Sequence, residues 1–328
     1  MPLAICAYMR MRERHPMDMA QAPAESLECQ KMPFAKRSRL TWQLKTQSLA
    51  LGLRTRVMGI LNVTPDSFSD GGRHFRTQDA IQHGLSMLSD GADILDIGGE
   101  STHPGKDPDT SETEQARILP VIAGILREHP SAILSVDTYH ADTAIAAIDA
   151  GAEIVNDVSG FLWDEAMAAA CARLACGVIL MHTRGRPGEW KHLPPLPHDQ
   201  VLSLVRTELA ERLRHAEEAG ISRAHILLDP GFGFGKAFDA NYPLLAELES
   251  LRSLGLPLLA ALSRKAFLGR TLADLYGGAD APVEARANAS LAGMVAAILA
   301  GADVVRVHDV KPAVEAARIA DAVLAAAP

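Results

Sequence analysis

The chain has 328 residues, of which 48% are hydrophobic and 5% aromatic, and its formal net charge is −8. This composition excludes a wholly disordered chain, a collagen-like chain and a disulfide scaffold, and the length fits one large α/β domain or two ordinary ones. Residues 1–56 carry ten Lys/Arg and four Asp/Glu, a net +6, whereas the other 272 residues carry 22 and 36, a net −14. Nucleic acid is therefore not the expected partner, because binding to its phosphates requires a positive surface.

The cysteines and the apolar runs indicate a cytoplasmic protein. The four cysteines form no CxxC pair and have no metal-ligand spacing, as expected for reduced thiols. No apolar run approaches the ~20 residues that span a bilayer, so we expect no membrane contact. The short N-terminal apolar stretch is followed by arginines, whereas a signal peptide has its basic residues first.

The first 56 residues differ from the rest of the chain. Four prolines interrupt any periodicity in residues 1–38, which we interpret as a flexible N-terminal extension. Residues 39–56 alternate weakly between apolar and polar side chains, as in a hairpin that precedes the first core strand. We expect residues 57–328 to form a single domain.

Eight short apolar runs, rich in Val, Ile and Leu, recur from Val57 onward. They lie at 57–62, 91–99, 132–138, 151–160, 177–183, 225–231, 257–265 and 301–310. Nearly continuous apolar runs are typical of parallel strands that are covered on both faces.

Helical patterns separate these runs, with apolar residues at three- and four-residue spacing. They include 111–128, 199–219, 241–254, 284–300 and 312–326. Eight strand–helix units in 272 residues match a (β/α)8 TIM barrel, whose usual length is about 250 residues. The alternative is a doubly wound open sheet, which more naturally has about five to seven strands.

Polar residues follow every apolar run at its C-terminal end. They are Asn62, Asp96, Asp137, Asn156 with Asp157, His182, Asp229, Ser263 to Lys265, and Arg306 with His308. In a barrel these strand ends meet on the face where active sites lie. One such residue alone is best interpreted as a hydrogen-bonding group at a strand terminus, but eight together indicate a polar ligand.

The residue types suggest what that ligand is. Carboxylate and amide groups suit a flat heterocycle with a guanidine-like edge; these are Asp137, Asn156 and Asp229. Basic groups suit an anion such as phosphate; these are Lys265, Arg306 and His308. The alternative is that some of these acidic and basic side chains neutralise one another.

Three loops contribute to this prediction. The glycine-rich polar segments 62–72 and 99–105 fit lids that close over a substrate, although ordinary connections would have similar compositions. Segment 229–236, DPGFGFGK, lacks the GxGxxG spacing of a dinucleotide site and predicts a turn that exposes Phe232 or Phe234. No HExxH motif or paired histidines indicate a protein-held zinc ion.

Seven motifs lie in order at these strand ends. They are MGILNVTPDSFSDGG (58–72), DIGGEST (96–102), SVDT (135–138), NDVSG (156–160), LLDPGFGFGK (227–236), SRK (263–265) and RVHDV (306–310). Together they resemble the dihydropteroate synthase family, the folate-pathway enzymes that sulfonamides inhibit. The resemblance extends from Val57 to near the end of the chain.

The resemblance implies a transferase. This family condenses 6-hydroxymethyl-7,8-dihydropterin diphosphate with p-aminobenzoate, and it forms 7,8-dihydropteroate and pyrophosphate. The implied cofactor is Mg²⁺, with Asn62 as its protein ligand. The resemblance also implies a homodimer whose partners are otherwise only the small-molecule substrates.

The resemblance assigns roles to individual residues. The implied pterin-binding residues are Asp96, Asp137, Asn156, Asp229, Lys265 and Arg306. Diphosphate binding falls to Asn62, Arg306, His308 and His103. The p-aminobenzoate site comprises Thr102, Ser263, Phe68, Pro104 and Phe234. The implied catalytic residues are Lys265, Arg306, His308 and Asp137.

Four positions depart from the family pattern. His103 stands where Arg is common, Arg184 where Gln is common, Ala261 where Gly is frequent and Ala266 where Ser is frequent. Two alternatives to a synthase follow: a barrel that binds methyltetrahydrofolate for methyl transfer, and a catalytically weak pterin-binding paralogue.

Overall fold

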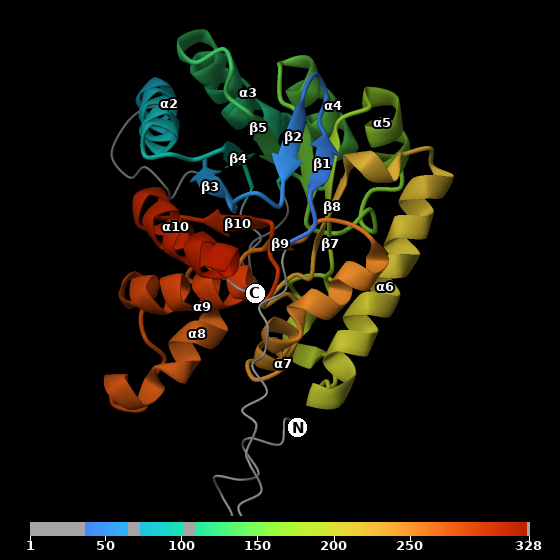
Figure 1. The fold of residues 1–328 in the computed structure, drawn as a ribbon. Coiled ribbons are helices and arrows are strands. Elements are labelled where there is room, and N and C mark those ends of the chain that lie inside the picture. Colours follow the sequence, from blue (N-terminus) through green and yellow to red (C-terminus); the bar gives the residue numbers. More distant parts are fainter. Residues whose placement is uncertain (1–36, 65–72, 101–108, 327–328) are drawn as a thin grey trace, which may run out of the picture. The chain divides into compact units, whose positions relative to one another are not determined.

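The structure is a computed structural model that describes residues 37–64, 73–100 and 109–326, all of which belong to one compact unit. Figure 1 shows the arrangement of its strands and helices. The predicted extension, except for residues 37 and 38, lies outside the described residues.

Eight parallel strands form the predicted (β/α)8 barrel (Figure 1). They are β3 (Arg56–Asn62), β4 (Ile94–Gly98), β5 (Leu134–Asp137), β6 (Ile154–Asp157), β7 (Gly177–Met181), β8 (Ile226–Asp229), β9 (Leu259–Ala260) and β10 (Val304–Val307). β3 to β8 pair in chain order, and β10 lies between β9 and β3. A parallel bridge between Leu228 and Leu258 closes the ring, so the open-sheet alternative is wrong.

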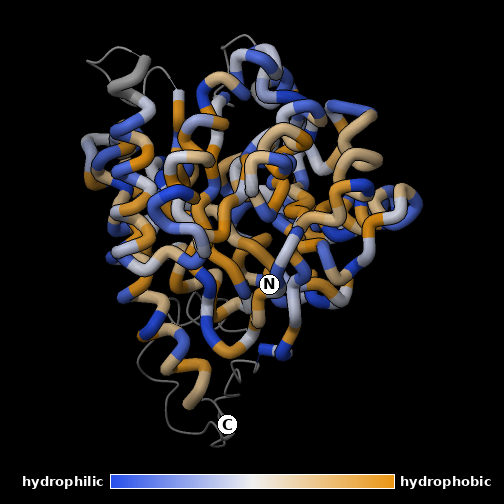
Figure 2. The backbone as a smooth tube through the Cα atoms, turned by 90° about the horizontal axis from the view of Figure 1, so that it is seen from above, coloured by the Kyte–Doolittle hydropathy of each residue, from blue (hydrophilic) through white to orange (hydrophobic). Residues whose placement is uncertain are grey.

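Helices surround these strands and shield their outward-facing apolar side chains. They include α2 (Arg73–Ser89), α3 (Ser111–Glu128), α4 (Ala141–Asp149), α5 (Met167–Leu174), α6 (His198–Glu218), α7 (Asn241–Ala246), α8 (Ala266–Thr271), α9 (Ala287–Leu299) and α10 (Val310–Ala326). The hydrophobic segments gather centrally and the hydrophilic ones peripherally (Figure 2). No described helix is both long and apolar enough to cross a membrane.

Three of the apolar runs, at 91–99, 151–160 and 301–310, begin with a glycine that ends a helix. Gly91, Gly151 and Gly301 have φ angles of 101°, 106° and 101°, a left-handed conformation that strongly favours glycine. In two of these runs the acidic residue two positions later binds the backbone of the barrel, whereas Glu153 accepts the backbone N–H of Thr46 in the hairpin. Asp93 accepts the backbone N–H of Val57 at 3.0 Å, and Asp303 accepts that of Leu258 at 3.0 Å.

A hairpin fills the end of the barrel where the strands begin. β1 (Leu40–Gln43) and β2 (Ser48–Leu51) pair antiparallel. Trp42 is fully buried, and its indole N–H donates to the carbonyl of His225 at 2.8 Å. The hairpin packs against inward-facing side chains near the strand starts, namely Met58, Ile94, Ile154, Ile179, Leu227, Leu259 and Val304. The opposite end, where the strands finish, is therefore the mouth of the barrel.

The helices differ from the predicted patterns at two places. The pattern over 241–254 forms α7 and then a 3-10 helix, Leu248–Leu254, rather than one α-helix. The pattern over 284–300 begins as a 3-10 turn, Val283–Arg286, before α9. Both segments are helical as predicted, and the difference lies in their 3-10 hydrogen bonding.

Candidate active site

The ends of four neighbouring strands lie side by side, and three of them carry polar side chains. Asn62 pairs in register with Gly98, Gly98 with Asp137, and Asp137 with Asn156. A Cβ on Gly98 would lie 3.5 Å from that of Asp137 and 3.9 Å from Oδ1 of Asn62. Because Gly98 has no side chain, a ligand can approach the backbone between these two residues.

Arg306, on β10, makes the central ionic contacts of the mouth. Its Nε lies 2.6 Å from Oδ2 of Asp96, and its Nη2 lies 2.6 Å from Oδ2 of Asp137. Burial lowers the pKa of Arg306, but these two carboxylates outweigh burial and raise it. The guanidinium therefore remains a cation and fixes two carboxylates in one geometry.

Asp96 retains a free acceptor. The residue is fully buried, and its Oδ2 accepts from Arg306 and, at 2.9 Å, from Nδ2 of Asn156. Its Oδ1 has no hydrogen-bond partner among the described residues. A buried acceptor without a donor is costly, so this oxygen marks a position where a donor on the ligand would be stabilising.

Burial shifts the pKa values of the surrounding groups toward neutral pH. It raises the pKa of Asp137 to about 7 and that of Asp229 to about 6. Burial, followed by the charge of Arg306, lowers the pKa of Lys265 to about 8. Such clustered shifts are typical of functional sites.

The glycine-rich turn after β8 places an aromatic ring beside Lys265. Phe232 is buried in the core, whereas Phe234 is partly exposed, so the second of the two predicted rings faces the mouth. Nζ of Lys265 lies 4.0 Å from the centre of the Phe234 ring. Lys236 is buried, and its ammonium group donates to the carbonyls of Gly231 at 2.7 Å and Phe234 at 3.3 Å. These bonds hold the turn in place.

Ser263 and His308 meet across the last two strands. Nδ1 of His308 lies 2.9 Å from Oγ of Ser263, and the His308 backbone N–H also points to this oxygen, at 3.3 Å. Burial, with the charges of Arg264 and Arg306, lowers the pKa of His308 to about 4. At neutral pH His308 is therefore an uncharged hydrogen-bonding group in the protein alone, and Lys265 and Arg306 carry the positive charge.

A cavity of about 470 Å³ adjoins this pair. It extends from Ser263 and His308 between α2, α9 and the first turn of α10. The backbone N–H groups at the start of a helix favour anions, whereas Asp90 and Asp309 add carboxylates to the lining of the same cavity.

Two of the strand-end residues make their contacts within the wall of the barrel and not in its mouth. The carboxylate of Asp157 accepts the backbone N–H groups of Ser159 at 2.7 Å and Phe161 at 2.8 Å. His182 is fully buried, and its Nε2 lies 2.9 Å from Glu208 of α6. The expectation that all eight strand ends supply the ligand site is therefore too broad.

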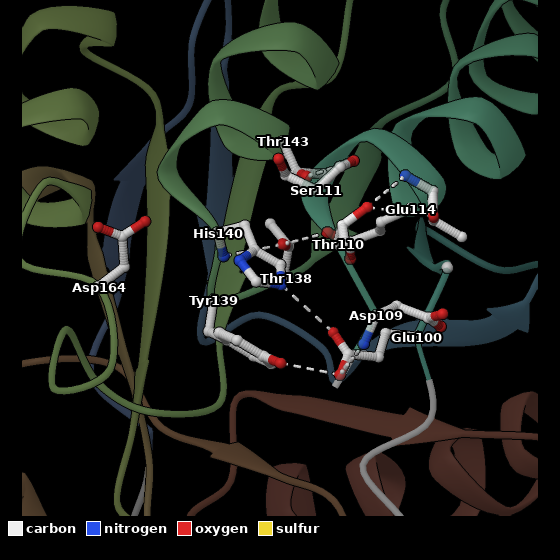
Figure 3. A network of polar contacts seen from close by, with 12 residues as sticks. Glu100, Asp109, Thr110, Ser111, Glu114, Thr138, Tyr139, His140, Thr143 and Asp164 are labelled. Atoms are coloured by element: carbon white, nitrogen blue, oxygen red, sulfur yellow. Dashed lines mark hydrogen bonds and ion pairs between the residues drawn. The ribbon is translucent and has the colours of Figure 1, made fainter. Parts of the chain in front are cut away.

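A polar network beside the mouth was missed by sequence reasoning (Figure 3). Glu100 accepts from the Tyr139 hydroxyl at 2.8 Å, and its second oxygen lies 3.5 Å from Nε2 of His140. The Glu100 contact raises the pKa of His140. Nearby, burial raises the pKa of Glu114 to about 7, and Thr138 donates to it at 2.8 Å. The only sequence signal was the acidic residue in GEST.

The same network fixes the residues on both sides of segment 101–108. Arg117, on α3, donates to the carbonyl of Gly99 at 2.7 Å and to Asp109 at 2.6 Å. The backbone N–H of Asp109 donates to Glu100 at 3.3 Å. Positions 99, 100 and 109 are thereby held together.

Four predicted site residues lie outside the described residues: Phe68, Thr102, His103 and Pro104. Of the departures from the family pattern, Arg184 donates to the carbonyl of Gly235 at 3.0 Å and so supports the glycine-rich turn. Ala261 is buried in the barrel interior, and Ala266 is exposed at the start of α8.

The described residues contain no group of three or more His, Cys, Asp or Glu arranged to hold a metal ion. Asn62 has an exposed side chain at the end of β3 and can supply one oxygen ligand. Mg²⁺ commonly combines few protein oxygens with phosphate oxygens and water, so Asn62 fits a site that the substrate completes.

A family match identifies this barrel, with buried acceptors around one arginine, as that of a pterin-binding enzyme. The model of the family described as "Pterin binding enzyme" matches residues 58–308. The chain is 42% identical over 280 residues to "Dihydropteroate synthase" of Bacillus subtilis (strain 168), a match that covers 85% of this chain and 92% of that one.

Solved structures agree with this relationship. A Xanthomonas albilineans dihydropteroate synthase with 4-aminobenzoic acid matches with a TM-score of 0.78 and 42% identity, covering 89% of this chain and 100% of that one. A structure of the enzyme from the same organism in complex with 7,8-dihydropteroate matches with a TM-score of 0.74 and 40% identity, with the same coverage. The chain belongs to the dihydropteroate synthase family.

Proposed function

We propose that the chain condenses 6-hydroxymethyl-7,8-dihydropterin diphosphate with p-aminobenzoate, and that it forms 7,8-dihydropteroate and pyrophosphate. The observation that carries this proposal is the bridge that Arg306 makes between Asp96 and Asp137 in the mouth of a barrel of this family. Related structures with 4-aminobenzoic acid and with 7,8-dihydropteroate support both the substrate and the product.

The pterin is proposed to bind among the buried acceptors. Its aminopyrimidinone edge presents several N–H donors, and Asp137, Asn156 and Asp229 offer complementary oxygens. Oδ1 of Asp96 is the further acceptor that still needs a donor. In this proposal Lys265 donates to the pterin carbonyl side, and the guanidinium of Arg306 lies against the ring face.

The diphosphate is proposed to lie on the basic side of the mouth, against Asn62, Arg306 and His308, with His103 as a further contact. Mg²⁺, with Asn62 as a protein ligand, would supply charge neutralisation for the diphosphate. A neutral His308 can donate through one ring nitrogen without adding charge. A wholly cationic site would instead retain the pyrophosphate after the reaction.

The p-aminobenzoate is proposed to lie nearer the solvent, between Ser263 and Phe234, with Thr102, Phe68 and Pro104 completing its site. Its neutral amine attacks the exocyclic CH₂ carbon, the bond from that carbon to the diphosphate oxygen breaks, and the nitrogen loses a proton. The pterin can delocalise positive charge, so we propose a loose, carbocation-like transition state. Arg306 stabilises the departing charge, and no general base is needed.

Pyrophosphate release that depends on p-aminobenzoate tests the proposed function. We expect turnover by the unchanged chain and near abolition in Lys265→Ala. Binding of the pterin diphosphate without any turnover would identify a catalytically weak paralogue, and activity only with methyltetrahydrofolate would support the methyl-transfer alternative. A single-turnover burst of hydroxymethyl-dihydropterin in the absence of p-aminobenzoate would support the dissociative step.

We also propose that the chain acts as a cytoplasmic homodimer. The small residues between positions 287 and 302 permit close packing of α9 against a second helix. Analytical ultracentrifugation at micromolar concentration tests this assembly, and a monomer at all concentrations would contradict it.

A further inference from the structure

The SRK motif contains a backbone conformation that its central residue rarely adopts. Arg264 has a φ of 59°, in the left-handed region where residues with a side chain are strained. It lies between Ser263, which contacts His308, and Lys265, which contacts Phe234. The conformation of Arg264 therefore decides where two proposed substrate-binding side chains point.

Side chains from outside the motif hold both peptide groups of Arg264. Its backbone N–H donates to Oγ of Ser290 at 2.9 Å, and its carbonyl accepts from Nη1 of Arg286 at 3.1 Å. Ser290 is 7% exposed, and its hydroxyl proton is used in a 2.7 Å bond to the carbonyl of Arg286. With that proton engaged, the oxygen lone pairs of Ser290 remain to accept from Arg264.

Arg286 is itself fixed by its surroundings. Its Nε donates to the carbonyl of Ala281 at 2.8 Å. Gly269, on α8, leaves room for the guanidinium, because a Cβ at that position would lie 2.4 Å from Nε of Arg286. The two hydrogen bonds from Arg286 and the space beside Gly269 therefore form one structural unit next to the SRK motif.

The side chain of Arg264 contributes less to this hold. It pairs with both oxygens of Asp309, at 2.8 and 3.1 Å, but these side chains are 36% and 40% exposed. Exposed ion pairs contribute little because water competes for them. The bond from the Arg264 backbone to Ser290, a buried residue, is the stronger constraint.

We infer that Ser290 and Arg286 are positioning residues for the arylamine side of the active site. They hold Arg264 in its left-handed conformation, and they thereby orient Ser263 and Lys265 toward the substrates. This inference rests on the proposed function, in which Ser263 contacts p-aminobenzoate.

Ser290→Ala tests the inference first. We expect the KM for p-aminobenzoate to rise about tenfold, since a buried backbone donor loses its acceptor, with a smaller change in kcat. Ser290→Thr keeps the hydroxyl and should return the KM to within about threefold of the unchanged chain. A lowered melting temperature with an unchanged KM would show a merely structural role and overturn the inference.

A matched pair of substitutions at position 264 isolates the backbone. Arg264→Gly and Arg264→Ala both remove the guanidinium, but only glycine adopts the left-handed conformation freely. We expect Ser290→Ala to raise the KM about tenfold when it is combined with Arg264→Ala, and less than about threefold when it is combined with Arg264→Gly. Equal effects in both combinations would overturn the inference.

A second measurement does not require turnover. Arg264→Gly should melt about 2–4 °C above Arg264→Ala, and Ser290→Ala should widen this gap. Absence of turnover in the unchanged chain would refute the proposed function and the positioning role with it. Equal melting temperatures of Arg264→Gly and Arg264→Ala would refute only the claim that residue 264 is held in its left-handed conformation.

Discussion

Arg306 and Asp96 form an ion pair at 2.6 Å in which the carboxylate is fully buried. The same guanidinium reaches Asp137, so a single side chain determines the separation of two carboxylates on different strands. The carboxylates of the mouth and its basic groups are therefore coupled through one residue, Arg306.

Arg306→Lys should reduce kcat/KM by at least about 100-fold. A lysine has a point charge on a flexible chain and cannot donate from a planar group to both Asp96 and Asp137. Steady-state kinetics and pterin binding measure the loss. Arg127→Lys, an exposed change on α3, is the matched control and should leave both unchanged. Near-normal activity of Arg306→Lys would contradict the central role of the bridge.

Asp137 should make the stability of the protein depend on pH. Burial raises its pKa from 3.8 to about 7, so the folded protein binds this proton more tightly than the unfolded chain does. The free energy of unfolding should therefore fall as the pH rises from about 4 to about 7, and Asp137→Asn should reduce this slope. Urea unfolding across this range measures it.

The control for this pH effect is Asp142→Asn, an exposed change on α4 that should keep the slope. Pterin affinity should rise with pH up to about 7 in the unchanged chain, because the ionised carboxylate is the better acceptor. The opposite pH trend in stability would show that Asp137 is ionised more readily than its burial implies.

Gly269→Ala should destabilise the fold by about 2 kcal/mol, because a methyl group cannot fit beside Arg286 without displacing it. The KM for p-aminobenzoate should rise as well, since Arg286 holds Arg264. Gly293→Ala is the matched control on α9, where the nearest side-chain atom would be 3.5 Å away. Denaturant unfolding and kinetics on both variants check this difference.

Trp42→Ala should cost about 3–5 kcal/mol of stability, whereas Trp42→Phe should cost less because it keeps most of the buried ring. The indole hydrogen bond to His225 is lost in both. Under conditions where each variant remains folded, kcat should be close to that of the unchanged chain, because the hairpin lies at the end of the barrel opposite the mouth. Exposed Leu53→Ala is the control.

The barrel could be predicted because its signal is repeated along the chain. Glycines such as Gly91 and Gly301 stand at the start of apolar runs of strand length, and the number of these runs restricts the possible folds. The sequence does not show which face of a strand a polar residue occupies at its end. Asn156 and Asp157 are adjacent, yet one reaches Asp96 in the mouth and the other binds the backbone of its own turn.

The positioning of side chains by residues far away in the chain could not be predicted from the sequence, for a physical reason. Ser290 lies 26 residues from Arg264, and nothing in a helical pattern marks a hydroxyl that accepts from a distant backbone. Glu100 lies within the DIGGEST motif, but its contacts with Tyr139 and His140 depend on the pairing of β4 with β5. Such roles arise from three-dimensional packing and are invisible to periodicity.

The hairpin at the end of the barrel where the strands begin determines how molecules enter and leave the site. Because Trp42 and its neighbours close the lower end, substrates and products share one entrance. The acceptors of Asp96 and Asp229 lie deepest, at 0% and 3% exposure, whereas Ser263 and Phe234 are partly exposed nearer the opening. If the substrates bind as proposed, the pterin would enter before the arylamine, and an arylamine analogue that binds second would trap the pterin beneath it.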